Sequence, residues 1–212
     1  MTERAPSRAP GGARRLVLAL HGHGSTGAEI AAVLSAGGHR TPILAPDGPE
    51  PATLVSTGRS WYPLSSAPET MQSRATPVAR RLAVYLGEAL RSRRLGPEQC
   101  CVIGFSQGSP VAALLVEFGA AQSAVFICGR IPRPMGPWPP GTRVRGIAGA
   151  LDRFAPPDMM RADLAATGLE AAHGDLLVLP DLGHELRPDV AAAAMAFAVA
   201  SAGHAVRREQ TS

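Results

Sequence analysis

The stretch QCCVIGFSQG runs from Gln99 to Gly108 and decides the fold. Its first half is apolar on both faces, as in a parallel strand that helices cover on both sides. Its second half precedes a helix-like segment. In a sharp strand-to-helix turn the apex residue is strained, and glycines two positions before and after it avoid collisions with the neighbouring strand and helix. Gly104 and Gly108 flank Ser106 in this way. The stretch therefore predicts a nucleophilic serine at the end of a buried strand.

Similar buried runs alternate with helix-like segments along the rest of the chain. This alternation predicts an α/β fold, with a mostly parallel sheet and helices on both faces. The segments 46–75 and 129–142 are rich in Pro and Gly, and we expect them to be loops that wall a site. The buried runs are 15–20, 41–45, 99–104, 123–128, 143–148 and 175–179, and the helix-like segments lie near 26–36, 76–94, 107–119, 158–168 and 188–202.

Length and composition indicate one domain. A chain of 212 residues, 45% of them hydrophobic and 18% charged, can form one core but not two ordinary domains with a linker. We expect a disordered tail at 1–13, which is rich in Pro, Gly, Ser and Arg, then a domain at 14–202 and a flexible tail at 203–212.

No part of the sequence predicts export or a membrane span. No window approaches the ~20 apolar residues of a membrane helix. The apolar run Leu16–Leu20 is too short for a secretory signal. The three cysteines do not form a disulfide framework, which favours a reducing compartment. We therefore expect the protein to be cytoplasmic.

The positive charge of the chain does not form a nucleic-acid motif. The net charge is +4, and all 21 basic residues are Arg, scattered along the sequence. A nucleic-acid footprint requires basic residues gathered on one face. We therefore expect no nucleic-acid partner.

The predicted nucleophile needs a base, and the base needs an orienting carboxylate. Asp152 follows the buried run at 143–148, and His184 follows the run at 175–179, which gives the chain order Ser106, Asp152, His184. These three residues are the predicted catalytic set. Asp158, Asp163 and Asp181 compete for the role of carboxylate, but only Asp152 directly follows a buried run. His39, His173 and His204 lie in expected surface connections or the C-terminal tail.

A developing oxyanion needs two preorganised donors. One is expected to be the backbone N–H of Gln107, which follows the nucleophile. The other is expected to be the backbone N–H of His23, in the glycine-containing loop LHGHG that follows the first buried run. For His21 we expect a structural role, bracing that loop through hydrogen bonds.

Two adjacent aromatic residues, Trp61 and Tyr62, lie in the connection GRSWYPL. Connections carry binding surfaces, and adjacent side chains in an extended segment point to opposite sides. We therefore expect Trp61 and Tyr62 to form one wall of the acyl pocket, with Arg59 as a substrate contact. The alternative is that Trp61 fills the gap under the 46–75 loop and that Arg59 anchors this loop.

Six short motifs of the chain resemble motifs that occur in the same chain order in a known family. LHGHGSTG is similar to its LHGxGD[ST]G loop, GFSQG to its nucleophile turn, RSWYPL to its R-x-W-[FY]-D, VFICGRIP to its SGxLP, GALDRFAP to its HGxxDxVVP and LGHEL to its GH[ED][IL]. The similarity extends from Arg15 to Ala200. The chain thus resembles the phospholipase/carboxylesterase family of small α/β-hydrolases, which includes bacterial carboxylesterases and acyl-protein thioesterases.

The resemblance implies an α/β-hydrolase fold, a doubly wound and mostly parallel sheet of about seven strands with helices on both faces and no large lid. It also implies hydrolysis of carboxylic esters or thioesters through an acyl-enzyme, with no metal and no cofactor. The expected substrate is a small-molecule or carrier-bound acyl compound.

Three other functions stay open. An internal nucleophile could resolve the same acyl-enzyme, which would make the chain a biosynthetic tailoring enzyme (a thioesterase, lactonase or cyclase). The fold could serve as a non-catalytic ligand-binding protein, or His184 could act as the base of a lyase or isomerase. The sequence does not determine the acyl chain length, the leaving group or the oligomeric state, a homodimer included.

Overall fold

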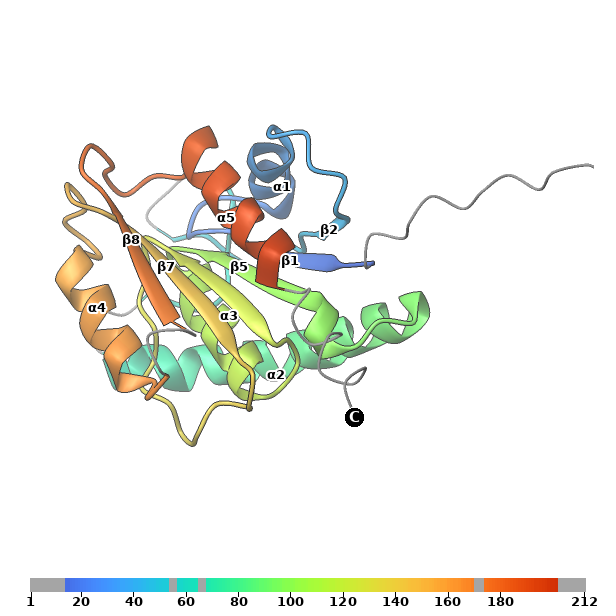
Figure 1. Cartoon of the computed structure of the whole chain (residues 1–212). Helices are drawn as coiled ribbons and strands as arrows, with labels where there is room; N and C mark the ends of the chain where they lie inside the picture. The colour runs from blue at the N-terminus through green and yellow to red at the C-terminus, as the bar shows by residue number, and fades with distance from the viewer. Residues whose placement is uncertain (1–13, 54–56, 65–67, 170–173, 202–212) are drawn as a thin grey trace, which may run out of the picture.

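The computed structural model describes residues 14–53, 57–64, 68–169 and 174–201. The predicted tails at 1–13 and 203–212 lie outside these residues. A central parallel sheet lies between two layers of helices (Figure 1). Among the described helices, none combines the length and the apolar character that a bilayer crossing requires.

The main sheet has six strands in the described part of the chain, all of them parallel. Their order is β2-β1-β5-β6-β7-β8. The predicted doubly wound sheet is confirmed, with six described strands where about seven were expected. A small antiparallel pair, β3 with β4, lies apart from it. The strands are β1 (Leu16–Leu20), β2 (Ile43–Leu44), β3 (Glu50–Pro51), β4 (Arg59–Ser60), β5 (Cys100–Phe105), β6 (Ser123–Ile127), β7 (Arg143–Gly149) and β8 (Gly174–Leu179).

The helices divide between the two faces of the sheet. Helices α1 and α5 cover one face, and α2, α3 and α4 cover the other (Figure 1). The helices are α1 (Gly27–Ser35), α2 (Pro68–Arg93), α3 (Gly108–Glu117), α4 (Pro157–Ala166) and α5 (Pro188–Ser201), and a short 3-10 helix, η1 (Pro97–Gln99), precedes β5.

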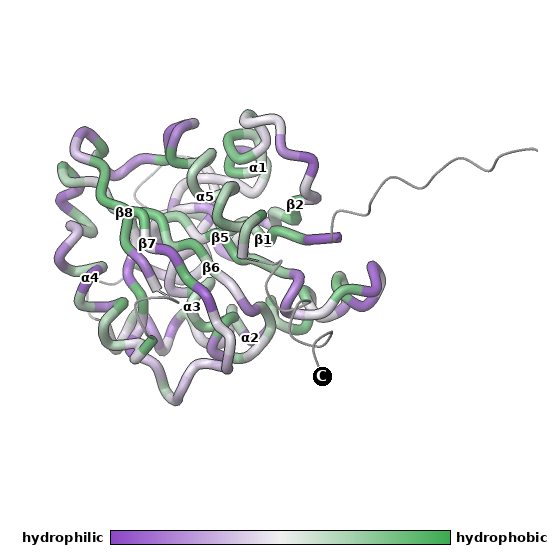
Figure 2. Tube along the Cα trace, viewed as in Figure 1, coloured by the Kyte–Doolittle hydropathy of each residue, from purple (hydrophilic) through white to green (hydrophobic). Residues whose placement is uncertain are grey.

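Each central strand contributes to both halves of the core. In β1, Leu16, Leu18 and Leu20 pack with α2 and α3, whereas Val17 and Ala19 pack with α1 and α5. This alternation follows from the two-residue period of a strand. It explains why β1 is apolar throughout, and Figure 2 shows hydrophobic residues concentrated along the central strands.

Helix α2 is longer than the sequence predicts. It begins at Pro68 rather than near residue 76, so that Pro77 lies inside it. A proline removes one helical hydrogen bond, here the bond to the carbonyl of Ser73. Because Pro77 and Ser73 are both exposed, water can take the place of the missing donor. The predicted helix start near residue 76 was therefore wrong, and part of the expected 46–75 loop is helical.

The strand order places two loops side by side. β2 lies on one side of β1 and β5 on the other, so the chain reverses its direction of sheet growth at β1. Ligands of doubly wound sheets bind at the carboxyl ends of the strands at such a point. Here the loop after β1 and the turn after β5 meet, because Leu20 is the register partner of Gly104.

Helix α3 packs close to β1 at Gly108. A Cβ atom on Gly108 would lie 2.2 Å from the carbonyl oxygen of Leu20. This oxygen belongs to the backbone of a central strand and cannot move away without disturbing the sheet. Glycine at this position therefore permits α3 to begin directly over the end of β1.

We expect Gly108→Ala to lower the free energy of unfolding by about 3 kcal/mol, because the added methyl group overpacks against backbone. Urea unfolding measures the effect. Gly136→Ala is the matched control, since a Cβ there would have no atom within 4 Å, and its effect should stay within about 0.5 kcal/mol. Equal midpoints for the two variants would contradict the described contact.

Candidate active site

The turn after β5 holds Ser106 in a strained conformation. Its φ is +50°, in the left-handed region that non-glycine residues rarely adopt. The Ser106 N–H donates to the carbonyl of Ile127 at 2.8 Å, which ties the turn to β6. A Cβ on Gly104 would lie 2.5 Å from the carbonyl oxygen of Gly108. The two glycines around the serine are thus required by close backbone contact.

Ser106, His184 and Asp152 form one hydrogen-bonded chain. Oγ of Ser106 lies 2.8 Å from Nε2 of His184, and Nδ1 of His184 lies 2.8 Å from Oδ2 of Asp152. An ionised carboxylate only accepts hydrogen bonds, so Nδ1 carries the proton that is donated to Asp152. Nε2 is then free to accept the hydroxyl proton of Ser106.

The carboxyl group of Asp152 is buried and fully hydrogen-bonded. Burial tends to raise its pKa, but hydrogen bonds from Ala155, His184 and Phe154 outweigh this effect and lower the pKa below its ordinary value of 3.8. The N–H groups of Phe154 and Ala155 donate to Oδ1 at 2.8 and 3.0 Å. Asp152 therefore carries a negative charge at neutral pH and orients the imidazole.

The competing carboxylates have other partners. Asp163 forms a two-pronged ion pair with Arg130. Asp181 pairs with Arg187, and the Asp158 side chain is almost fully exposed. Of the four candidate carboxylates, all of which lie in the described part of the chain, only Asp152 hydrogen-bonds to His184. Of the other histidines, His173 and His204 lie outside the described residues.

The two predicted oxyanion donors lie beside the serine and are available. Within the described part of the chain, the backbone N–H groups of Gln107 and His23 donate to no other group. A Cβ on Gly22 would lie 3.4 Å from Cβ of Ser106, so the loop after β1 passes close to Ser106. Both amides can therefore serve a tetrahedral oxyanion.

His21 braces this loop, as predicted. Its Nε2 accepts a hydrogen bond from the N–H of Gly48 at 2.9 Å, so Nδ1 must carry the proton that is donated to the carbonyl of Gly22 at 2.7 Å. Burial lowers the pKa of His21 below its ordinary value of 6.5. The neutral ring joins the loop after β1 to the loop that leads into β3.

The side chain of Gln107 acts as a bridge between the nucleophile turn and the segment after β4. Its Oε1 accepts from the backbone N–H of Trp61 at 3.0 Å, and its Nε2 donates to the carbonyl of Tyr62 at 2.7 Å. The Ser60 hydroxyl lies within hydrogen-bond distance of the same amide oxygen. The Gln107 side chain thus pairs with this segment as a neighbouring peptide group would.

The prediction that Trp61 walls the acyl pocket is wrong. Only 1% of Trp61 is exposed, its ring packs against His21 and its Nε1 donates to the His21 carbonyl at 2.8 Å. It does not line the pocket beside Ser106. The alternative expectation is correct, because the ring fills the space between the segment after β4 and the loop after β1.

The predictions for Arg59 and Tyr62, the other two expected substrate-binding residues, have opposite outcomes. The guanidinium of Arg59 donates to the carbonyls of Gly48 and Pro49, so Arg59 is a loop anchor and not a pocket residue. Tyr62 does line the pocket, although little of it is exposed, and its hydroxyl donates to the carbonyl of Gln107 at 3.3 Å.

A pocket of about 810 Å³ opens beside Ser106 and His184. The sequence analysis did not identify most of its apolar wall. The loops predicted as walls do contribute, but single positions within them could not be ranked from the sequence. The other lining residues are His23, Tyr62, Leu64, Met71, Gln107, Pro110, Cys128, Gly129, Arg130, Phe154, Ala155 and Met159.

The pocket offers no second nucleophile and no metal site in the described part of the chain. Burial raises the pKa of the Cys128 thiol to about 12, so this cysteine stays protonated. No group of three or more His, Cys, Asp or Glu side chains in the described segments could hold a metal ion. The expectation of cofactor-free chemistry stays a prediction.

Comparisons with known proteins agree with this architecture. A family model described as phospholipase/carboxylesterase matches residues 8–130. The chain is 22% identical to esterase PE8 over 90% of this chain and 94% of that one, with a TM-score of 0.74. It is 19% identical to Arabidopsis thaliana SOBER1 over 90% of this chain and 99% of that one, with a TM-score of 0.72. It is also 19% identical to the Bacillus cereus carboxylesterase, over 88% of this chain and 89% of that one, with a TM-score of 0.69. At these identities the structures bear on the fold alone. No curated protein sequence matches significantly.

We expect Gln107→Met to lower the free energy of unfolding by about 1–3 kcal/mol, because it leaves the buried N–H of Trp61 without an acceptor, whereas the carbonyl of Tyr62 keeps the Ser60 hydroxyl as a donor. Gln122→Met is the control, since the Gln122 amide only makes a long contact of 3.4 Å to Pro140 at the surface. Urea unfolding compares the two. A Gln107 variant as stable as the control would show that the bridge is dispensable.

We expect Trp61→Ala to lower the free energy of unfolding by about 3–5 kcal/mol, as for a large buried side chain, and to leave the preference for acyl chain length unchanged. Met159→Ala is the comparison, because Met159 lines the pocket and is 36% exposed. It should alter the preference with little loss of stability. A changed preference in the Trp61 variant would restore Trp61 to the pocket wall.

Proposed function

This chain belongs to the phospholipase/carboxylesterase family, and on that premise we propose that it is a serine hydrolase that cleaves carboxylic esters or thioesters through an acyl-enzyme. The observation that carries the proposal is the continuous hydrogen-bonded chain from Ser106 through His184 to Asp152. It connects three residues from different loops in the arrangement that a serine nucleophile requires.

Acylation follows from the proton positions in this chain. Nε2 of His184 takes the hydroxyl proton while Oγ of Ser106 attacks the substrate carbonyl carbon. The imidazolium that forms is stabilised by the ionised Asp152. The negative charge moves to the carbonyl oxygen, where the N–H groups of Gln107 and His23 donate to it. When the tetrahedral intermediate collapses, Nε2 returns its proton to the leaving alkoxide or thiolate.

Deacylation repeats these steps with water. His184 takes a proton from water, the resulting hydroxide attacks the acyl carbonyl, and the same two amides bind the second oxyanion. Collapse then releases the carboxylic acid, and Ser106 regains its proton from His184. Each proton moves among the Ser106 hydroxyl, Nε2 of His184, the leaving group and the attacking water, so the cycle balances with one water consumed per ester or thioester cleaved.

The pocket favours an apolar acyl group of moderate size. Its volume of about 810 Å³ lies in the range of small-molecule sites. Leu64, Met71, Pro110 and Met159 supply apolar surface, and the flexible methionine side chains can adapt to different chain lengths. Phe154 lies against the His184 ring at the mouth and is 79% exposed, where it can contact the leaving group.

The three cysteines support an intracellular setting. All of them are buried and unpaired. Free thiols are typical of a reducing compartment, and the cytoplasm is the location that we propose.

We expect Ser106→Ala to lower kcat/KM for p-nitrophenyl butyrate by about 10³-fold or more, because it removes the nucleophile. The thermal midpoint should change by only a few degrees, since a small, partly exposed hydroxyl is lost. A fluorophosphonate probe, read by peptide mass spectrometry, should label Ser106 in the parent chain and nothing in the variant. Ser73→Ala, which changes an exposed serine on α2, serves as the control.

Other outcomes would favour the other functions. A folded parent chain that takes no label on Ser106 would favour a binding protein. Turnover that survives Ser106→Ala would favour a lyase or isomerase that uses His184 as base. A cyclic product from a tethered acyl substrate would favour a tailoring enzyme, since an internal nucleophile would then have replaced water.

A further inference from the structure

A second groove lies at the opposite end of the sheet from Ser106. It has a volume of about 640 Å³ and forms where β1 and β2 begin and where α2 and α5 end. In Figure 1 the beginnings of β1 and β2 and the end of α2 lie at the right, and α5 ends nearer the centre, beside β1. Five of its lining residues are basic or carry an imidazole, and the others are apolar or hydroxylic. The lining residues are Arg14, Arg15, His39, Arg40, Thr41, Pro42, Arg93, Leu95 and Val199.

The positive charge of this groove is not neutralised by the described residues. No acidic side chain lines it, and Arg14, Arg15, Arg40 and Arg93 form no ion pair among the residues that the structure describes. Other arginines of the same protein differ, since Arg130, Arg145 and Arg187 each bind a carboxylate through more than one hydrogen bond. The fold therefore brings together arginines that lie far apart in the sequence.

One donor in the groove is buried without an acceptor. Nε of Arg15 is closed off from solvent, and it has no hydrogen-bond partner in the described part of the chain. A buried N–H group without a partner is costly, and each such group in a native protein calls for an explanation, of which a bound ion is one. Arg93 is partly engaged, because its Nη1 donates to the Ala89 carbonyl at the end of α2.

We propose that this groove binds a small molecule that carries phosphate. Guanidinium groups match phosphate oxygens in geometry and charge, and several of them here require a ligand of more than one negative charge. The volume is that of a small-molecule site, and Pro42, Leu95 and Val199 offer an apolar surface for the rest of the ligand. A pocket of this size at one end of the sheet is not an extended basic stripe, which nucleic acid would need.

The groove is separate from the proposed acyl site. Arg15 directly precedes β1, whereas the loop that carries His23 follows β1. The five residues of β1 span roughly 16 Å. Substitutions in the groove should therefore leave the basal hydrolysis of a simple ester unchanged, and failure of either proposal would not imply failure of the other.

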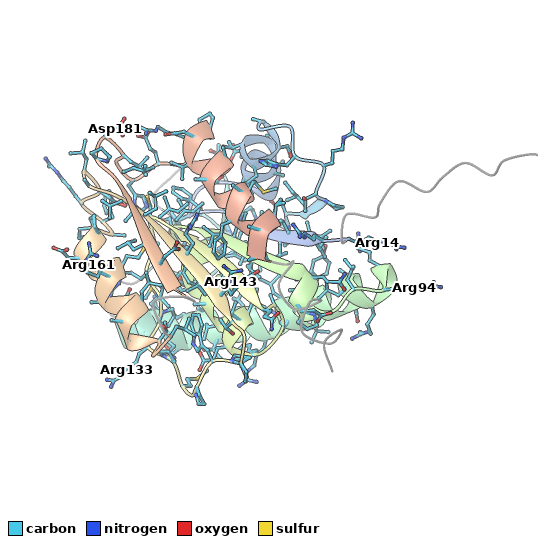
Figure 3. All side chains as sticks on the ribbon, in the orientation of Figure 1. Arg14, Arg94, Arg133, Arg143, Arg161 and Asp181 are labelled. Atoms are coloured by element: carbon cyan, nitrogen blue, oxygen red, sulfur yellow. The ribbon has the colours of Figure 1, made fainter. Side chains whose placement is uncertain are left out.

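The test is a calorimetric titration of the full chain with inorganic pyrophosphate at constant ionic strength. We expect the double substitution Arg15→Gln, Arg40→Gln to raise the dissociation constant about tenfold or more, because charge-assisted hydrogen bonds are lost. The matched control is Arg133→Gln, Arg161→Gln, which changes the net charge by the same amount. Figure 3 shows Arg133 and Arg161 far from Arg14. The control should bind as the parent does.

Each remaining outcome overturns the proposal. Equal weakening in both double variants would mean that pyrophosphate responds to overall charge and not to a site. If pyrophosphate at about 1 mM gives no heat of binding, any dissociation constant is weaker than about 1 mM, and the groove is not a phosphate site. Tighter binding of a short single-stranded DNA, lost in the same groove variant, would make nucleic acid the ligand instead.

Discussion

The parallel pairing of β1 with β5 is the constraint on which the candidate site depends. Parallel neighbours end at the same edge of a sheet, and the register of Leu20 with Gly104 makes these two strands end together. Because the strand order reverses at β1, the helices that follow β1 and β5 lie on opposite faces of the sheet, and the two loops can meet. The loop that carries His23, the proposed oxyanion donor, and the turn that carries Ser106, the proposed nucleophile, are thereby brought close together by the backbone alone.

Side-chain hydrogen bonds then hold the meeting loops rigid. His21 joins the loop after β1 to Gly48, and Gln107 joins the nucleophile turn to the segment that carries Trp61. Trp61 connects these two bridges, since its indole N–H donates to the carbonyl of His21. These side chains satisfy backbone groups that irregular loops would otherwise bury unpaired. The amides of Gln107 and His23 are left free, and a site needs such preorganised donors.

The sequence predicted what depends on local pattern and missed what depends on long-range packing. Buried runs located the strands, and the order Ser106, Asp152, His184 matched the residues that the structure joins, because each follows a strand of one parallel sheet. Trp61 could not be placed, since a pocket wall and a plug both look like an aromatic residue in a loop. Its contact with His21 bridges distant segments. The basic groove could not be predicted from the sequence either, because only the strand order brings its arginines together.

The strained backbone of Ser106 has an evolutionary consequence. A left-handed conformation at a non-glycine residue costs about 1–3 kcal/mol, and glycine would adopt it freely. Replacement of Ser106 by glycine would thus remove the proposed nucleophile and release the strain together. Selection for the stability of the fold alone would therefore favour glycine over serine at position 106. Under the proposed function, the chain thus gives up about 1–3 kcal/mol of stability to hold a serine at this position.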